Sequence, residues 1–63
     1  MDITEIKAGD RVHLRAVPEE GFKEEDAFVI DVDTDTGILL CTDVIDGETF
    51  FEVDINQVDH IVK

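Results

Sequence analysis

The fold of this chain is decided by residues 27–54, AFVIDVDTDTGILLCTDVIDGETFFEVD. Apolar and β-branched residues recur along this stretch, and clusters of Asp, Thr and Gly interrupt it, which is the pattern of short strands separated by turns. We expect three consecutive strands: Ala27–Asp33, Ile38–Ile45 and Glu48–Asp54. Thr34–Gly37 forms the first connection. The stretch therefore predicts a three-stranded antiparallel meander.

The pair Asp46-Gly47 is a strong hairpin signal, because a two-residue type I′ turn needs positive φ at both of its central positions. Such a turn predicts that Ile45 faces Glu48 and that Thr42 faces Phe51. Side chains alternate between the two faces of a strand, so the register also predicts which residues point inward. The expected inward residues are Phe28, Ile30, Val32, Ile38, Leu40, Thr42, Val44, Phe51, Val53 and Ile55.

Two further strands flank the meander. Arg11–Val17 alternates, with Val12, Leu14 and Ala16 on one face, and this predicts a half-buried strand that Pro18 ends. The charged segment Glu19–Asp26 is expected to be a surface loop in which Phe22 is a plug under the sheet. After the meander, Asp54–Val58 predicts a 3₁₀ turn, and Asp59–Lys63 predicts a last short strand with Ile61 or Val62 inward.

The length of 63 residues predicts one domain, near the lower limit for a chain that folds without disulfides or metal. The single cysteine, Cys41, excludes an internal disulfide and is expected to be a reduced thiol in a reducing compartment. The chain has no run of about 18 apolar residues, so we expect no membrane span. Residues 1–5 lack the pattern of a signal peptide. We therefore expect a soluble cytoplasmic protein.

The charge balance is strongly acidic, with 17 Asp and Glu against five Lys and Arg, for a net charge of −12. Binding to nucleic acid depends on Lys and Arg that displace counterions from phosphates, so this composition disfavours nucleic acid and anionic membranes as direct ligands. It attracts basic surfaces and accelerates encounter with them. The alternative, that the acidity only keeps a small domain soluble or suits a salty habitat, stays open.

The order of the expected elements resembles that of an SH3-like barrel. The start of the first strand, Ile6–Val12 (IKAGDRV), resembles the G-D-x-V pattern of many such barrels, including KOW-type modules, and Phe51–Val58 (FEVDINQV) resembles their fourth strand running into a 3₁₀ turn. An Sm-like barrel is a similar variant. The resemblance implies one all-β domain over residues 1–63, a five-stranded barrel with a long acidic loop after the first strand and a 3₁₀ turn before the last.

Departures from that pattern weaken the usual ligands of the fold. The chain has no Trp or Tyr for a groove that binds proline-rich peptides. An aromatic cage for a methylated side chain has only four Phe to draw on, two of which, Phe28 and Phe51, are assigned to the core. RNA-binding KOW modules are usually basic, and this chain is acidic.

No cofactor, metal or catalytic site is predicted. Residues 31–37 (DVDTDTG) resemble the first half of a calcium loop, but Gly falls one place late and Thr42 stands where a closing Glu belongs. His13 and His60 have no further ligand at a recognisable metal spacing. Cys41 lies among acids, which disfavour a reactive thiolate. We therefore expect no enzyme.

Two surfaces are candidate binding sites. The first is an apolar patch with an acidic rim on the outer face of the meander, a combination suited to partner binding. Its candidate residues are Asp31, Asp33, Asp43, Glu52, Leu39, Cys41 and Phe50, with Val29 beside them. The second is a basic stripe on the first strand, Arg11, His13 and Arg15, which either contacts nucleic acid or forms ion pairs with the surplus of acids.

Two functional hypotheses follow. The first is a small non-catalytic module, a monomer or small homo-oligomer, that docks on a basic partner protein; its sharper form is a nucleic-acid mimic that inhibits a nucleic-acid-binding enzyme. The second is a KOW- or Sm-like accessory domain of transcription or translation that touches RNA through Arg11, His13 and Arg15.

Overall fold

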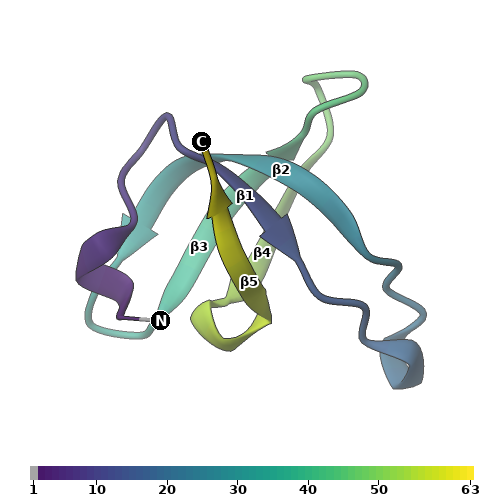
Figure 1. Cartoon of the computed structure of the whole chain (residues 1–63), viewed down its shortest axis with the longest axis horizontal. Helices are drawn as coiled ribbons and strands as arrows, with labels where there is room; N and C mark the ends of the chain where they lie inside the picture. Colours follow the sequence, from purple (N-terminus) through teal and green to yellow (C-terminus); the bar gives the residue numbers. More distant parts are fainter. Residues whose placement is uncertain (1) are drawn as a thin grey trace.

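The computed structural model describes residues 2–63 and consists of five strands joined by turns and short 3₁₀ helices (Figure 1). The strands are β1 (Arg11–Leu14), β2 (Glu25–Asp33), β3 (Ile38–Asp43), β4 (Phe50–Asp54) and β5 (Val58–Val62). They form one antiparallel sheet in the order β4-β3-β2-β1-β5. The prediction of an all-β chain is confirmed. The sheet is open, with β4 and β5 at its two edges.

The strands are placed as predicted, but six of their ends differ, two of them in β5, which begins and ends one residue earlier than the expected Asp59–Lys63. β1 stops at Leu14 instead of Val17, and β2 begins at Glu25, two residues before the expected Ala27. β3 stops at Asp43 and β4 begins at Phe50, because the connection between them is longer than two residues. The segment between β1 and β2 contains the 3₁₀ helix Pro18–Glu20 (η2), and Ile3–Glu5 (η1) forms another near the N-terminus.

The predicted type I′ turn is wrong. Within residues 2–63 only glycines have positive φ, so Gly47 (φ 67°) adopts the left-handed conformation and Asp46 does not. The connection spans residues 44–49 and is closed by the Asp43 N–H, which donates to the Thr49 carbonyl over 3.1 Å. The Asp46 carboxylate accepts hydrogen bonds from both the Glu48 and Thr49 N–H groups and from the Thr49 hydroxyl. Asp46 therefore folds a six-residue loop.

The longer loop shifts the register between β3 and β4 by one residue. Leu39 pairs with Val53, Leu40 pairs with Glu52, and Thr42 pairs with Phe50. A one-residue shift moves every side chain of a strand to the opposite face relative to its neighbour. In β4 the predicted faces hold, with Val53 buried and Phe51 packed against the core. In β3 they are reversed.

The other neighbour of β3 is β2, and a β-bulge within β2 changes which of its side chains point inward. The pairing shifts between Val29 and Asp31, which leaves Ile30 as the extra residue. In a regular strand, side chains two residues apart point to the same face; across a bulge with one extra residue, side chains three residues apart do so. Val29 is therefore buried before the bulge, and Val32 packs against the same core after it.

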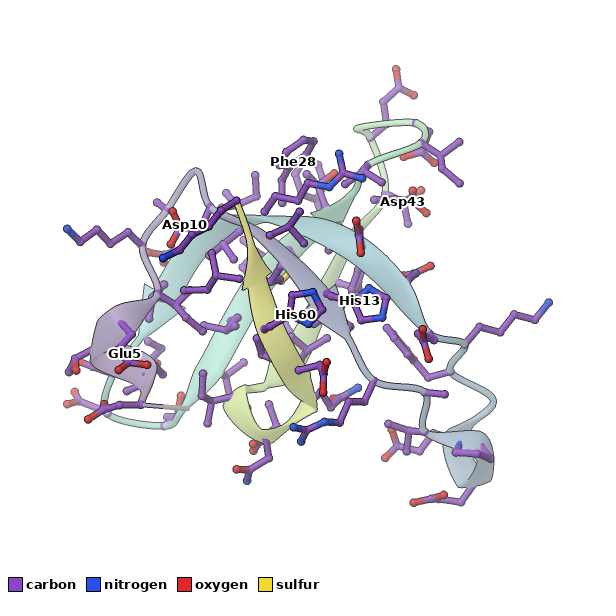
Figure 2. The ribbon with its side chains drawn as sticks, viewed as in Figure 1. Glu5, Asp10, His13, Phe28, Asp43 and His60 are labelled. Atoms are coloured by element: carbon purple, nitrogen blue, oxygen red, sulfur yellow. The ribbon has the colours of Figure 1, made fainter. Side chains whose placement is uncertain are left out.

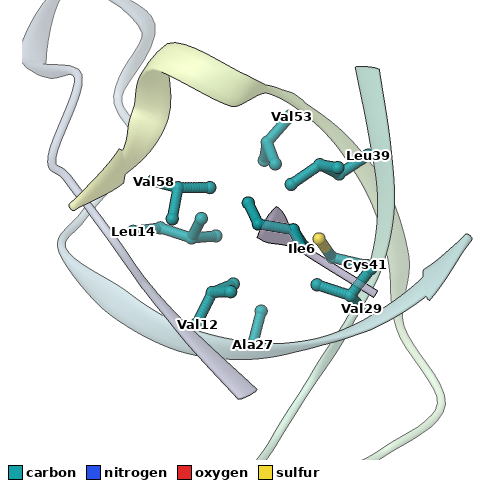
Figure 3. Close-up of a cluster of buried hydrophobic side chains, with 9 residues drawn as sticks. All are labelled: Ile6, Val12, Leu14, Ala27, Val29, Leu39, Cys41, Val53 and Val58. Carbon is teal, nitrogen blue, oxygen red and sulfur yellow. The ribbon is translucent and has the colours of Figure 1, made fainter. Parts of the chain in front are cut away.

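The core contains nine buried residues, which Figure 3 shows converging between the two halves of the curved sheet. They are Ile6, Val12, Leu14, Ala27, Val29, Leu39, Cys41, Val53 and Val58. Val12, Leu14 and Val53 were predicted to be inward. Phe22 also packs on this cluster as expected, with its ring centroid 5.9 Å from that of Phe51.

Several predicted core residues face outward instead. Phe28 and Ile30 are 38% and 44% exposed, and Ala16 lies beyond the end of β1 and is exposed. Ile38 and Leu40 are half-buried on the outer face of β3, and Val44 lies in the loop. The faces of β2 before its bulge and of β3 were therefore predicted incorrectly.

The 3₁₀ turn before the last strand is confirmed at Ile55–Gln57 (η3). Asp54 caps it, since its carboxylate accepts from the Asn56 N–H, and the Gln57 side chain accepts from the Asp54 N–H. Beyond it, Ile61 of β5 packs on the core, as expected. None of the helical turns in residues 2–63 is long and apolar enough to span a membrane.

Candidate functional site

The outer face of β3 carries a shallow groove of about 370 Å³ with an apolar floor and acidic walls. Ile38 and Leu40 form the floor. Asp31, Asp33, Glu52 and Thr36 line the remainder; these six residues are called the acidic groove below. The register places Leu40 between Asp31 of β2 and Glu52 of β4. It places Ile38 between Asp33 of β2 and Asp54 of β4, so each apolar side chain is flanked by two carboxylates.

The structure corrects part of the predicted partner-binding set. Leu39 and Cys41 are fully buried and Val29 is 1% exposed, so these three side chains belong to the core and present nothing to a partner. Asp43 lies at the end of β3, where its carboxylate accepts from the Ile45 N–H over 2.7 Å. It does not line the acidic groove.

Asp31, Asp33 and Glu52 are brought together in the acidic groove, and Phe50 is 61% exposed on the same face of β4. The predicted combination of an apolar patch and an acidic rim therefore exists, but Ile38 and Leu40 supply its apolar part in place of Leu39 and Cys41. None of the three carboxylates has a Lys, Arg or His ion-pair partner among residues 2–63. Their charge is available to an external cation.

Arg11 and His13 of the predicted basic stripe lie on the outer face of β1, Arg15 follows just after the end of the strand, and all three bind carboxylates. The Arg11 guanidinium contacts Asp26 Oδ2 through Nη2 at 2.9 Å and through Nε at 3.0 Å. The Arg15 Nε lies 3.2 Å from Asp59 Oδ1, and its Nη1 donates to the Asn56 carbonyl. The expected ion pairing with the surplus of acids is confirmed. Phosphate would have to compete with these carboxylates.

His13 is the centre of this charged network. Its Nδ1 lies 2.6 Å from Asp26 Oδ1, and its Nε2 lies 2.9 Å from Glu24 Oε1. His60 of β5 pairs with His13 across the strands, and the two imidazole rings stack with centroids 5.2 Å apart (Figure 2). Hydrogen bonds to Asp26 and Glu24 raise the pKa of His13, since both carboxylates favour the imidazolium. The hydrogen bonds from His13 and Arg11 in turn lower the pKa of Asp26.

The raised pKa of His13 predicts a pH-dependent stability. A group whose pKa is higher in the folded state stabilises the fold fully below its unfolded pKa, which is 6.5 for His. That stabilisation is lost as the pH rises through the folded pKa. We expect the free energy of unfolding, measured by urea denaturation across the neutral range, to fall with rising pH.

His13→Gln is the control, because glutamine keeps a polar side chain and cannot be protonated. The variant should lose most of the slope of unfolding free energy against pH above 6.5. His60→Gln reports the contribution of the stacked partner. Parallel pH profiles for the wild type and His13→Gln would contradict the assignment.

The other polar candidates have structural roles. Burial raises the pKa of the Cys41 thiol to about 11, which opposes thiolate formation. Asp33 Oδ1 accepts from the Asp35 and Thr36 N–H groups and so caps the turn between β2 and β3. Over residues 2–63, no set of three or more His, Cys, Asp or Glu side chains is arranged to hold a metal ion.

Sequence reasoning missed the residues that form the outer apolar surface. Phe28, Ile38 and Leu40 were assigned to the core, and Ile45 was assigned to a strand, yet Ile45 is 92% exposed in the loop after β3. One signal for the β3 residues was the strict alternation of Glu52 and Asp54 with Phe51 and Val53 in β4, which identified the outer face of β4 correctly. With the strands paired one residue further along, Glu52 lies opposite Leu40 and Asp54 lies opposite Ile38, which places Ile38 and Leu40 on the outer face.

Comparison of the chain with protein-family models, curated proteins and solved structures gives no significant match.

Proposed function

We propose that this chain is a non-catalytic binding module that docks on a basic surface of a partner protein through the acidic groove. One observation carries the proposal: three carboxylates that form no ion pair with a basic side chain among residues 2–63 surround a half-buried apolar floor on the outer face of β3. The five ion pairs among residues 2–63 lie on β1, β2, β5 and the segment before β2 instead.

The groove suits the side chain of a lysine or an arginine. Both residues have an apolar stem that packs on aliphatic surface and a charged end that remains polar. Ile38 and Leu40 offer the surface for the stem, and Asp31, Asp33 and Glu52 offer acceptors for the charged end. Charge-assisted hydrogen bonds of this type are stronger than neutral ones. With a net charge of −12, the whole chain also attracts a basic partner before contact.

Nucleic-acid mimicry is the sharper form of the proposal. The acids on this face form two rows on either side of β3, Asp31 and Asp33 on β2 and Glu52 and Asp54 on β4. Carboxylates two residues apart on a strand are separated by about 7 Å, and the two rows are about 10 Å apart, from the spacing of strands in a sheet. Two parallel rows of negative charge support the idea that the face imitates phosphates towards a nucleic-acid-binding protein.

We also propose that the open sheet is a member of the SH3-like barrel class. The strand order β4-β3-β2-β1-β5 supports this, as do the bulged β2 that pairs on both of its sides and the 3₁₀ turn before β5. The class hosts many functions, so the fold by itself assigns none.

Charge reversal in the groove tests the proposed function. Asp31→Lys combined with Glu52→Lys should abolish capture of basic proteins from a lysate by the immobilised chain at low salt. Capture by the wild type should weaken at high salt, because salt screens exposed charges. Each captured protein is then identified and its binding measured with purified material.

The matched control is Glu19→Lys combined with Glu20→Lys in η2, which changes the net charge equally on an exposed segment outside the groove. This control should capture the same proteins as the wild type. Equal loss in both variants would show that overall charge, and not the groove, is responsible. Recovery of RNA that depends on Arg11 and Arg15 would favour the accessory-domain hypothesis instead.

A further inference from the structure

Thr42 continues the outer face of β3 beyond the acidic groove. It pairs with Phe28 of β2 on one side and with Phe50 of β4 on the other. Directly opposed residues of an antiparallel pair project to the same face. Both phenylalanines are exposed, 38% and 61%, so this row lies on the outside of the sheet. Between them Thr42 is only 6% exposed.

The Thr42 hydroxyl lacks a hydrogen-bond partner. Within the described part of the chain, Oγ1 is a buried side-chain oxygen for which no donor or acceptor is in reach. Buried polar atoms in native proteins are nearly always paired, and an unpaired one is unfavourable. A valine has almost the same shape and would avoid that penalty. The position of this hydroxyl, on a face open to partners, points to a polar group that arrives with a ligand.

Phe28 already contacts one guanidinium. The Arg11 side chain lies over its ring, 5.9 Å from the centroid, and Asp26 holds that side chain on the β1 side. Among residues 2–63 no second cation lies over the Phe28 ring, on whose β3 side Thr42 and Phe50 follow in the sheet. Aromatic faces attract cations, and guanidinium stacks on them in preference to the strongly hydrated ammonium of lysine.

We infer that Phe28, Thr42 and Phe50 form a subsite for an arginine side chain of the basic partner. The guanidinium enters between the two rings and donates an N–H to Thr42 Oγ1, while Phe50, the more exposed ring, moves to admit it. Glu52 follows Phe50 by two residues on the same face of β4 and adds an acceptor at the groove end of the subsite. This inference rests on the proposed function, because it specifies the residue that the same face binds.

The test compares binding of fluorescein-labelled hexa-arginine and hexa-lysine by fluorescence anisotropy at low salt. The wild type should bind hexa-arginine more tightly. Thr42→Val should weaken binding of hexa-arginine by about tenfold, the effect of losing a hydrogen bond to a charged group. It should leave binding of hexa-lysine nearly unchanged. Thr42→Ser, which keeps the hydroxyl, should behave as the wild type.

A second measurement separates binding from folding. Thr42→Val removes an unpaired buried hydroxyl, so its thermal midpoint should be equal to or higher than that of the wild type while its affinity for hexa-arginine falls. Equal affinities for both peptides, or no effect of Thr42→Val on hexa-arginine, would overturn the arginine subsite and leave the acidic groove intact. Binding of neither peptide to the wild type would overturn the proposed function and this inference together.

Discussion

Leu39→Ala is expected to destabilise the fold by about 2–5 kcal/mol, the range for truncating a fully buried leucine, whereas Leu40→Ala should destabilise it by about 1 kcal/mol or less. The two leucines are adjacent and chemically identical, so the difference between them reports only which face of β3 points inward. Leu39 is completely buried between Val32 and Val53, and Leu40 is half-buried in the acidic groove between Asp31 and Glu52. Urea denaturation followed by circular dichroism measures both free energies of unfolding.

A chain of this size has only about 3–5 kcal/mol of stability to lose. Leu39→Ala can therefore unfold completely, and the milder pair Leu39→Val and Leu40→Val keeps the comparison measurable. The order of the two effects should be the same in both pairs. If Leu40 were the more sensitive position, the register through Ile45 and Glu48 would be correct and the groove would not exist.

Cys41 is expected to react with a thiol reagent such as iodoacetamide on the order of a hundred times more slowly in the folded chain than in denaturant, or slower still. Its side chain is fully buried and burial raises its pKa to about 11, so reaction requires both exposure and thiolate formation. The folded chain reacts mainly through the small population that opens, which sets the ratio of the two rates.

The rate of Cys41 modification is followed by mass spectrometry of the intact chain, with unfolded chain in urea as the reference. Leu39→Val provides an internal check, because a destabilised fold should react faster in proportion to its unfolded population. Fast modification of the wild type under conditions where circular dichroism shows intact strands would place Cys41 on the surface and contradict the assigned faces.

Most of the strands could be predicted because each is bounded by strong local signals. The 3₁₀ turn predicted over Asp54–Val58 forms as η3, and Pro18, predicted to end the first strand, starts a 3₁₀ helix soon after β1 ends. Val12 and Leu14 alternate with Arg11 and His13, so charge identifies the outer face of β1. Local composition is sufficient wherever one face of a strand is polar.

The faces of β2 and β3 could not be predicted in the same way. Residues 28–30 and 38–41 are apolar on both faces, so alternation does not distinguish inside from outside there. In β3 the choice then depended on the turn at Asp46-Gly47, whereas in β2 the alternation was extended through a bulge at Ile30 that residue types do not reveal. Asp46 stabilises the longer loop through three hydrogen bonds without adopting positive φ, an outcome that residue types at a turn do not distinguish from type I′.

The sequence predicted an apolar patch with an acidic rim on the outer face, but it assigned the wrong apolar residues to that patch. Asp31, Asp33 and Glu52 were named correctly as outward, because acids are rarely buried in a small core. Phe50 was named with them because it shares a face of its strand with Glu52. Leu39 and Cys41 were named as their apolar neighbours through the same one-residue error. The Thr42 hydroxyl is buried and unpaired because Thr42 lies between Phe28 and Phe50 in the sheet. Only the pairing of β2, β3 and β4 in the structure reveals this position.

The most direct test of the proposed binding face is a methyl-resolved NMR titration of the wild-type chain with hexa-arginine. The binding face consists of outward side chains on β2, β3 and β4, so the methyl signals of Ile38, Leu40 and Thr42 should shift with added peptide. The core methyls of Leu14 and Leu39 should move little. Shifts confined to residues near His13 and His60 on β1 and β5, or no shifts at peptide concentrations that saturate the anisotropy signal, would contradict the account.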